Sequence, residues 1–108
     1  MEHWDLPRHP VEPHQPEVLQ SAQGEGRAVL LALPAGEQLQ EHCVQERAYV
    51  VVVAGRVQIT GSQAVETGPG GLVVFDPAET HGVTALEDAR LLLVLAPWPS
   101  PNHRGATR

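Results

Sequence analysis

The sequence contains no lysine: each of its seven basic residues is an arginine. Enzymes that form a Schiff base with a carbonyl substrate need a lysine amine, so this class of chemistry is excluded. The arginines are spread along the chain, and the formal net charge is −6. Without a basic stripe to neutralise phosphate groups, we do not expect the protein to bind nucleic acid.

Cysteine and long apolar segments are also scarce. Cys43 is the single cysteine, which excludes an internal disulfide and is typical of a reducing compartment. The first residues, MEHWDLPRHP, lack the apolar segment of a secretory signal. The longest apolar stretch, LLLVLAPW at 91–98, is far shorter than the ~20 residues that a membrane-spanning helix needs. We therefore expect a cytoplasmic protein that does not engage a membrane.

Aromatic residues make up only 4% of the chain, whereas 42% of the residues are hydrophobic and 19% are charged. This balance is typical of a globular protein. A length of 108 residues is enough for one domain with a single core. Because aromatic side chains are so few, we expect that core to consist of valine, leucine and alanine.

Proline divides the chain into three regions. Residues 1–17 carry four prolines after Leu6 and show no helical periodicity, which predicts an extended N-terminal arm. Residues 18–96 form the body of the protein. Residues 97–108 begin with PWPSP and continue with polar residues, which predicts a flexible C-terminal tail.

The body consists of short apolar or alternating segments that are separated by glycine and proline turns. Residues 56–60, RVQIT, show the clearest alternation, with Val57 and Ile59 between polar neighbours. Short strands at this spacing are typical of an all-β sandwich or barrel. A helical turn is expected only around residues 17–22. The predicted strands are 27–33, 41–44, 48–54, 56–60, 64–67, 72–75, 81–86 and 90–96.

Two segments of the body resemble the sequence motifs of the cupins, a superfamily of small β-barrels. In LPAGEQLQEH and the later AGRVQI, Gly36, His42 and Gly55 have the spacing of the first cupin motif. GGLVVFDPAETHGV resembles the second motif, with His81 as its histidine and a proline-to-histidine gap one residue shorter than usual. The resemblance covers about residues 27–96 and is greatest to short bacterial cupins. It implies an all-β fold: a single-domain, RmlC-like jelly-roll β-barrel of two antiparallel sheets.

The same resemblance implies a divalent metal held by three histidines and a glutamate. His42 and His81 occupy two of these positions, but Val44 replaces the remaining histidine and Ala48 replaces the glutamate. Residues two apart on a strand share a face, so Glu46 has the inward parity of His42 and is a candidate substitute. His42, His81 and Glu46 are thus a tentative metal set. We do not firmly expect a cofactor. If these residues bind a metal, it would be zinc, manganese, iron or nickel at low occupancy.

Two function classes follow from these residues. In the first, the barrel binds an unidentified small molecule and has no strong catalytic activity. We favour this class because neither motif is accompanied by a lysine or by paired carboxylates. In the alternative, a metal held by His42 and His81 serves an oxygenase or isomerase that acts on a small organic substrate. The residues expected to line the cavity are His42, Val44, Ala48, Val50, His81 and Val83, with both imidazole rings facing the same interior.

We expect the protein to form a homodimer. The segments 48–54 and 90–96 are apolar on both faces, whereas a small barrel has only one interior to fill. A monomer would leave a contiguous apolar patch in water, which soluble monomers seldom do. A two-fold pair would cover this patch with its own copy.

Overall fold

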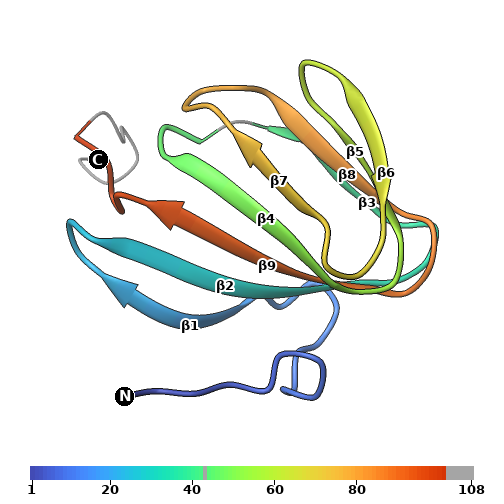
Figure 1. Cartoon of the computed structure of the whole chain (residues 1–108), viewed down its shortest axis with the longest axis horizontal. Helices are drawn as coiled ribbons and strands as arrows, with labels where there is room; N and C mark the ends of the chain where they lie inside the picture. The colour runs from blue at the N-terminus through green and yellow to red at the C-terminus, as the bar shows by residue number, and fades with distance from the viewer. Residues whose placement is uncertain (43, 102–108) are drawn as a thin grey trace.

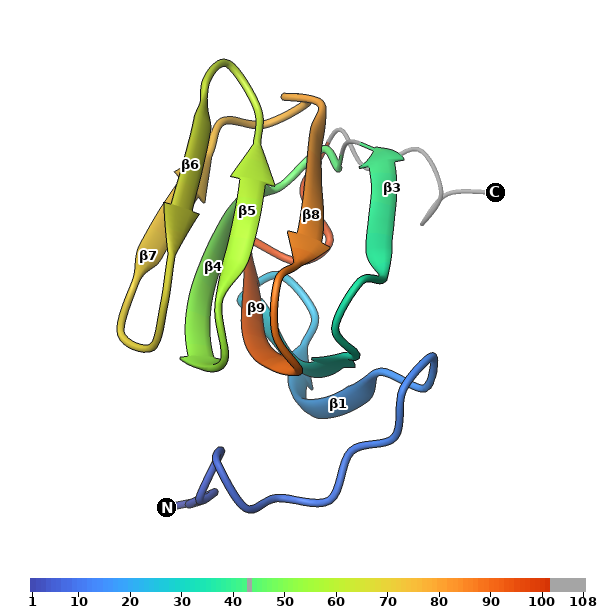
Figure 2. The same cartoon turned by 90° about the vertical axis from the view of Figure 1, so that its right-hand side faces the viewer.

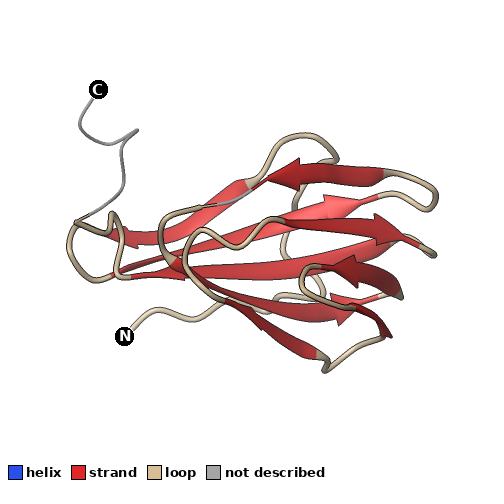
Figure 3. Ribbon diagram, turned by 90° about the horizontal axis from the view of Figure 1, so that it is seen from above, coloured by secondary structure: helices blue, strands red, loops and turns tan. Residues whose placement is uncertain are grey.

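The structure, a computed structural model that describes residues 1–42 and 44–101, consists of two antiparallel sheets that face each other (Figure 1). One sheet has the order β1-β2-β9-β4-β7 and the other has the order β3-β8-β5-β6 (Figure 2). Every regular element in the described residues is a strand, which confirms the predicted all-β class (Figure 3). The strands are β1 (Glu17–Ala22), β2 (Gly26–Leu33), β3 (Gln38–His42), β4 (Arg47–Ala54), β5 (Val57–Thr60), β6 (Ala64–Thr67), β7 (Leu72–Phe75), β8 (His81–Ala85) and β9 (Ala89–Ala96).

The facing sides of the two sheets enclose a core of aliphatic side chains. In β4, Ala48 and Val50 are buried, whereas the residues that alternate with them are only half-buried. In β5, Val57 and Ile59 are buried beside polar neighbours. This alternation follows from the two-residue period of a strand. Phe75 is the one aromatic member of the buried core cluster, so the predicted core of valine, leucine and alanine is confirmed for the described residues.

Residues 17–22 form the edge strand β1, so the helical turn expected there is wrong. The strand pairs with β2, and its register shifts between Val18 and Gln20. The sequence EVLQSA has no regular alternation of apolar and polar residues, so its local pattern does not reveal a strand. Main-chain pairing with β2 determines its conformation, and this pairing is a tertiary effect.

The N-terminal arm is fastened to the outer side of the five-stranded sheet by an arginine. Residues 5–9 form a tight turn in which the N–H of His9 donates to the carbonyl of Asp5 at 2.8 Å. Arg90 of β9 donates from Nη1 to the carbonyl oxygens of Leu6, at 2.8 Å, and of His9, at 2.6 Å. A charged guanidinium group is a strong hydrogen-bond donor to carbonyl oxygens. Arg90 therefore joins the arm to the sheet.

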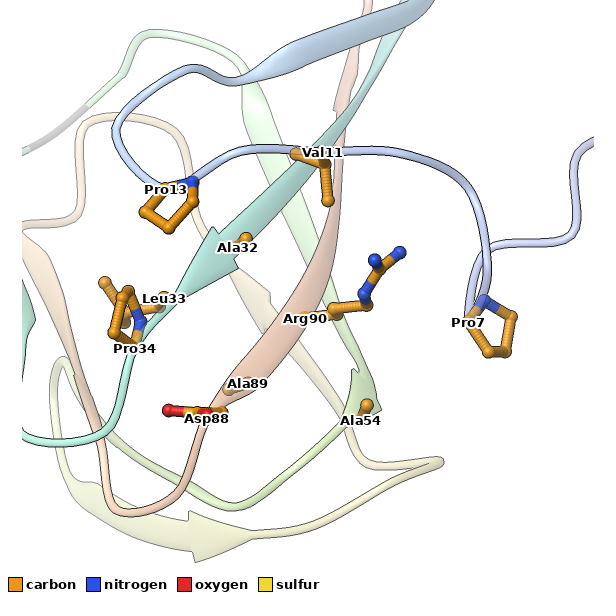
Figure 4. A pocket seen from close by; sticks show the side chains of 10 residues that line it. All are labelled: Pro7, Val11, Pro13, Ala32, Leu33, Pro34, Ala54, Asp88, Ala89 and Arg90. Atoms are coloured by element: carbon orange, nitrogen blue, oxygen red, sulfur yellow. The ribbon is translucent and has the colours of Figure 1, made fainter.

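A groove of about 320 Å³ remains between the arm and the ends of β2 and β9 (Figure 4). The arm contributes Val11 and Pro13 to its walls, and the sheet contributes Ala32 and Arg90. By strand register, Leu30 lies on the same side of the sheet as Arg90, and it is buried. The arm thus covers part of the apolar outer side from which we predict a dimer.

The chain leaves β9 and continues along the barrel. Trp98 packs against the core cluster, and its carbonyl accepts a hydrogen bond from the N–H of Gly24 at 2.6 Å. Residues 97–101 of the predicted tail therefore make defined contacts, and residues 102–108 lie outside the described residues. Within the described part of the chain, no helix has the length and apolar character needed to cross a membrane.

Association into a homodimer stays a prediction, and strand β7 offers the place to test it. Leu72 is 60% exposed and Val74 is 44% exposed, and both lie on the outer side beside Val51 and Tyr49 of β4. We expect light scattering at micromolar concentration to give about twice the single-chain mass of 11.6 kDa. Val74→Glu should lower the mass to that of one chain, because a charge would be placed in the apolar contact.

Leu86→Glu is the matched control for this experiment. Leu86 is exposed to a similar degree, 46%, but lies in the turn between β8 and β9. A dimer through the outer side of the five-stranded sheet should tolerate this change. A mass near 11.6 kDa for the unmodified protein would contradict the prediction.

Candidate functional site

Two polar side chains are buried among the described residues, Glu46 and His81. Glu46 is 1% exposed and immediately precedes β4, whereas His81 is 5% exposed and is the first residue of β8. Burying a carboxylate or an imidazole costs free energy unless each polar atom is hydrogen-bonded. Both residues are candidates for function, because neither is needed to fill an aliphatic core.

Strand pairing brings these two residues to the same end of the barrel. Ala48, two residues after Glu46, pairs with Phe75 of β7. The ring of Phe75 stacks on the imidazole of His81, with centroids 4.1 Å apart and planes inclined by 14°. The backbone of His42 in β3 pairs with that of His81 from the other side.

The orientation of the His81 ring is fixed by a main-chain acceptor. Its Nδ1 lies 3.1 Å from the carbonyl oxygen of Glu79. A carbonyl oxygen can only accept, so Nδ1 must carry the proton in this contact. In the neutral ring, Nε2 is then the nitrogen with the lone pair. Stacking on Phe75 restrains the plane of the ring, so this lone pair has a defined direction.

The carboxylate of Glu79 holds together the two loops beside the stack. Its Oε1 accepts from the main-chain N–H of Asp76 and its Oε2 from that of Ser62, both at 3.0 Å. These hydrogen bonds, with that of Asp76 the larger contribution, lower the pKa of Glu79 from its ordinary value. Glu79 therefore stays ionised at neutral pH, and the loop that presents its carbonyl to His81 is anchored at both ends.

Gly61, in the turn between β5 and β6, is required by this arrangement. A Cβ atom at this position would lie 2.9 Å from Cε1 of Phe75 and 3.0 Å from Oε2 of Glu79. Any larger residue would have to displace the ring that stacks on His81 or the carboxylate that anchors the loop. The absence of a side chain at Gly61 thus helps to position His81.

A cleft of about 410 Å³ opens to solvent beside the Phe75 ring. Residues of β5, β6 and β7 and of the loops that adjoin them line it. Since Phe75 both lines this cleft and stacks on His81, a single ring separates the imidazole from the cleft. The lining residues are Ile59, Gly61, Ser62, Gln63, Val65, Leu72, Val73, Val74, Phe75, Asp76 and Glu79.

The residues that were predicted to line the cavity have different environments. Ala48, Val50 and Val83 are buried members of the core cluster, and Val44 is half-buried and packs against that cluster. His81 lies at the barrel end described above. The side chain of His42 lies outside the described residues, so the expectation that both rings face one interior stays a prediction, as does the role of the whole set as a ligand cavity.

The described residues do not fit the four-ligand metal set that the sequence motifs imply. Ala48 and Val44, which occupy two ligand positions, offer no donor atom. In the part of the chain that the structure describes, no group of three or more His, Cys, Asp or Glu side chains could hold a metal ion. His81 and Glu46 remain as donors, and the side chains of His42 and Cys43 lie outside the described part.

The sequence assigned no role at this site to four residues of the region: Phe75, Glu79, Trp98 and Ser100. Ser100 donates its main-chain N–H to Oε2 of Glu46 at 2.9 Å, across 54 positions of sequence. The one available signal is composition, since Phe75 is the only phenylalanine and Trp98 is one of two tryptophans. In a chain with so few aromatic residues, each large ring is a candidate for a specific contact.

Solved structures of known proteins share this architecture. An RmlC-like cupin protein from Desulfovibrio desulfuricans is 22% identical, with a TM-score of 0.79 over 90% of this chain and 97% of that one. A conserved protein of unknown function from Streptococcus pyogenes is 24% identical, with a TM-score of 0.73 over 88% and 89%. An RmlC-like cupin family protein with a double-stranded β-helix fold from Methanocaldococcus jannaschii is 17% identical, with a TM-score of 0.68 over 76% and 78%.

No family model matches the sequence, and no curated protein matches it either. The structural likeness therefore establishes the fold. The chain has the RmlC-like cupin fold, and the jelly-roll barrel of two antiparallel sheets that the motifs predict is confirmed.

Replacing Glu79 with glutamine should remove a stabilisation that depends on pH. Because the pKa of Glu79 is lowered by folding, the unfolded chain binds this proton more readily than the folded chain. The stabilisation is complete above the ordinary pKa of glutamate and is lost as the pH falls through the lowered pKa of the folded protein. We expect the unmodified protein to melt at a higher temperature than Glu79→Gln at neutral pH, and the difference to shrink in acid.

Glu87→Gln, at an exposed position in the turn before β9, is the control and should leave the melting temperature unchanged. If the difference between Glu79→Gln and the unmodified protein were equal at neutral and acidic pH, the charge of Glu79 could not be its cause.

Added Zn²⁺, Mn²⁺ or Fe²⁺ should raise the melting temperature only slightly. A site in which Val44 and Ala48 replace two ligands cannot bind the folded state tightly, so the linked stabilisation is small. Scanning fluorimetry on protein without a histidine tag, first treated with a chelator, measures this directly. A large metal-dependent increase that His81→Ala abolishes would contradict the prediction and support the metalloenzyme alternative.

Proposed function

We propose that this cupin-fold chain binds a small organic molecule at the barrel end that holds Glu46 and His81, without strong catalytic activity. The supporting observation is that these two polar side chains are buried at one end of an otherwise aliphatic core. Ligand sites of proteins usually combine apolar walls with a few polar groups that fix the orientation of the ligand. Glu46 and His81 would supply those groups, and Ala48, Val50 and Val83 would supply the walls.

The two polar groups differ in what they would offer to a ligand. The carboxylate of Glu46 accepts hydrogen bonds. His81, with Nδ1 committed to the carbonyl of Glu79, offers Nε2 as an acceptor when neutral and as a donor when protonated. A ligand with hydroxyl or amide groups on a compact apolar frame would match this combination.

A metal-dependent oxygenase or isomerase is the second candidate. In its favour, the backbone of His42 pairs with that of His81, and Glu46 is buried at the same barrel end. These three residues would be the ligands, and a bound metal would supply Lewis-acid chemistry to a small organic substrate. Against it, Val44 and Ala48 stand where two further ligands would be expected. The metal titration described above distinguishes the two candidates.

The proposal includes a cellular setting. A single cysteine suits the reducing conditions of the cytoplasm, and we propose that the protein acts there as a homodimer. The apolar outer side of β7, with Leu72 and Val74 exposed, supports the dimer.

A screen of small hydroxylated, carboxylated and amide-bearing molecules by thermal shift tests the proposed function. A ligand at about 100 times its Kd stabilises the folded state by about 2.7 kcal/mol, which is readily detected. His81→Phe is the informative variant, because it keeps a ring to stack on Phe75 but removes both nitrogens. We expect it to weaken binding about tenfold, the equivalent of one hydrogen bond.

Gln58→Ala, on the exposed side of β5, should leave binding unchanged and serves as the control. The proposal would be wrong if no molecule of these classes stabilised the protein. It would also be wrong if every molecule that did so bound His81→Phe as tightly as the unmodified chain.

A further inference from the structure

The segment that follows β9, residues 97–101, contacts Glu46, which is buried at one end of the barrel. Three elements hold it in place. The N–H of Gly24, in the turn between β1 and β2, donates to the carbonyl of Trp98 at 2.6 Å. The guanidinium carbon of Arg27 lies 4.8 Å from the centroid of the Trp98 ring. The N–H of Ser100 donates to Oε2 of Glu46 at 2.9 Å.

The sequence of this segment leaves few main-chain N–H groups that could donate to Glu46. Residues 97–101 read PWPSP, so only Trp98 and Ser100 have a main-chain N–H to donate. Proline lacks the N–H that strand pairing needs, so the segment cannot pair as an inner strand. It bends after β9, and the Ser100 N–H is directed to the Glu46 carboxylate. We refer to residues 97–101 as the strap.

The Glu46 carboxylate is the group that the proposed function assigns to a ligand. Its side chain is 1% exposed, and one of its oxygens already accepts a hydrogen bond from the strap. A ligand that binds this oxygen must first remove the Ser100 N–H from it. Since an uncompensated buried acceptor is costly, the exchange is favourable only if the ligand brings a donor of its own.

We infer that residues 97–101 act as an autoinhibitory strap, in which the Ser100 N–H takes the place of a ligand donor at Glu46. The inference rests on the proposed function, and it narrows the ligand class. The ligand carries an N–H or O–H group, as an amide, a hydroxyl or an ammonium, and it binds Glu46 as the strap opens. Trp98, which packs on the core and under Arg27, is the anchor from which the end of the strap moves away.

Ser100→Pro tests the strap with little other change, because it removes the N–H and continues the run of prolines. Ser100→Ala is the matched control, since it keeps the N–H and loses only the hydroxyl. In a Trp4→Phe background Trp98 is the single tryptophan, so acrylamide quenching of its fluorescence reports how firmly the strap is held. We expect Ser100→Pro to raise the quenching constant at least about twofold, and to raise it more than Ser100→Ala does. Equal quenching in the two variants would overturn the inference.

The ligand class is tested with two probes of similar size, acetamide and N,N-dimethylacetamide. Acetamide has N–H donors and dimethylacetamide has none, so only acetamide can replace the Ser100 N–H at Glu46. Followed by amide chemical shifts, acetamide should bind Ser100→Pro about tenfold more tightly than the unmodified protein, and dimethylacetamide should bind neither. Equal binding of both probes would show that a donor is not required.

The two tests separate the strap from the proposed function. If quenching responds to Ser100→Pro but neither probe nor any screened molecule binds, the strap exists and the proposed function fails. If molecules bind but Ser100→Pro leaves both quenching and affinity unchanged, the proposed function stands and the strap is wrong.

Discussion

A carboxylate and an imidazole that are removed from water must find hydrogen-bond partners. Glu46 and His81 are both buried in a barrel whose other core side chains are aliphatic, apart from Phe75. Much of the irregular structure at this end of the molecule meets that requirement. The carbonyl of Glu79 accepts from His81, and the N–H of Ser100 donates to Glu46. The loop before β8 therefore follows a path that brings a carbonyl oxygen to His81, and the segment after β9 follows a path that brings an N–H to Glu46.

The partners of the buried pair are themselves anchored by groups that form no part of the core. Glu79 uses its carboxylate to hold two loops together while its carbonyl orients His81. Gly61 leaves the space that the Phe75 ring and the Glu79 carboxylate occupy. Each of these residues acts through His81, so the ring that we propose to contact a ligand has a single well-defined orientation.

Both ends of the chain cover surfaces that a bare barrel would leave open. The N-terminal arm lies on the outer side of the five-stranded sheet, where Arg90 binds the carbonyls of Leu6 and His9. The strap that follows β9 contacts Glu46 at one end of the barrel. In each case the prolines lack the N–H that pairing within a sheet needs, and hydrogen bonds to the barrel hold the segment in place.

The sequence by itself determined the features that depend on residues close together in the chain. The alternation of Val57 and Ile59, together with the glycine and proline turns, predicted strands because a strand repeats every two residues. The resemblance of two segments to the cupin motifs implied the barrel and identified His42 and His81 as the candidate histidines. The missing lysine excluded one class of chemistry outright.

Only the tertiary structure decided the features that join distant parts of the chain. EVLQSA is a strand because it pairs with β2, and its own pattern does not indicate one. The contact between Ser100 and Glu46, and the stacking of Phe75 on His81, depend on which strand ends meet at one end of the barrel. The local sequence does not determine these contacts, because they depend on the order in which whole strands pair and on the side chains that this order buries.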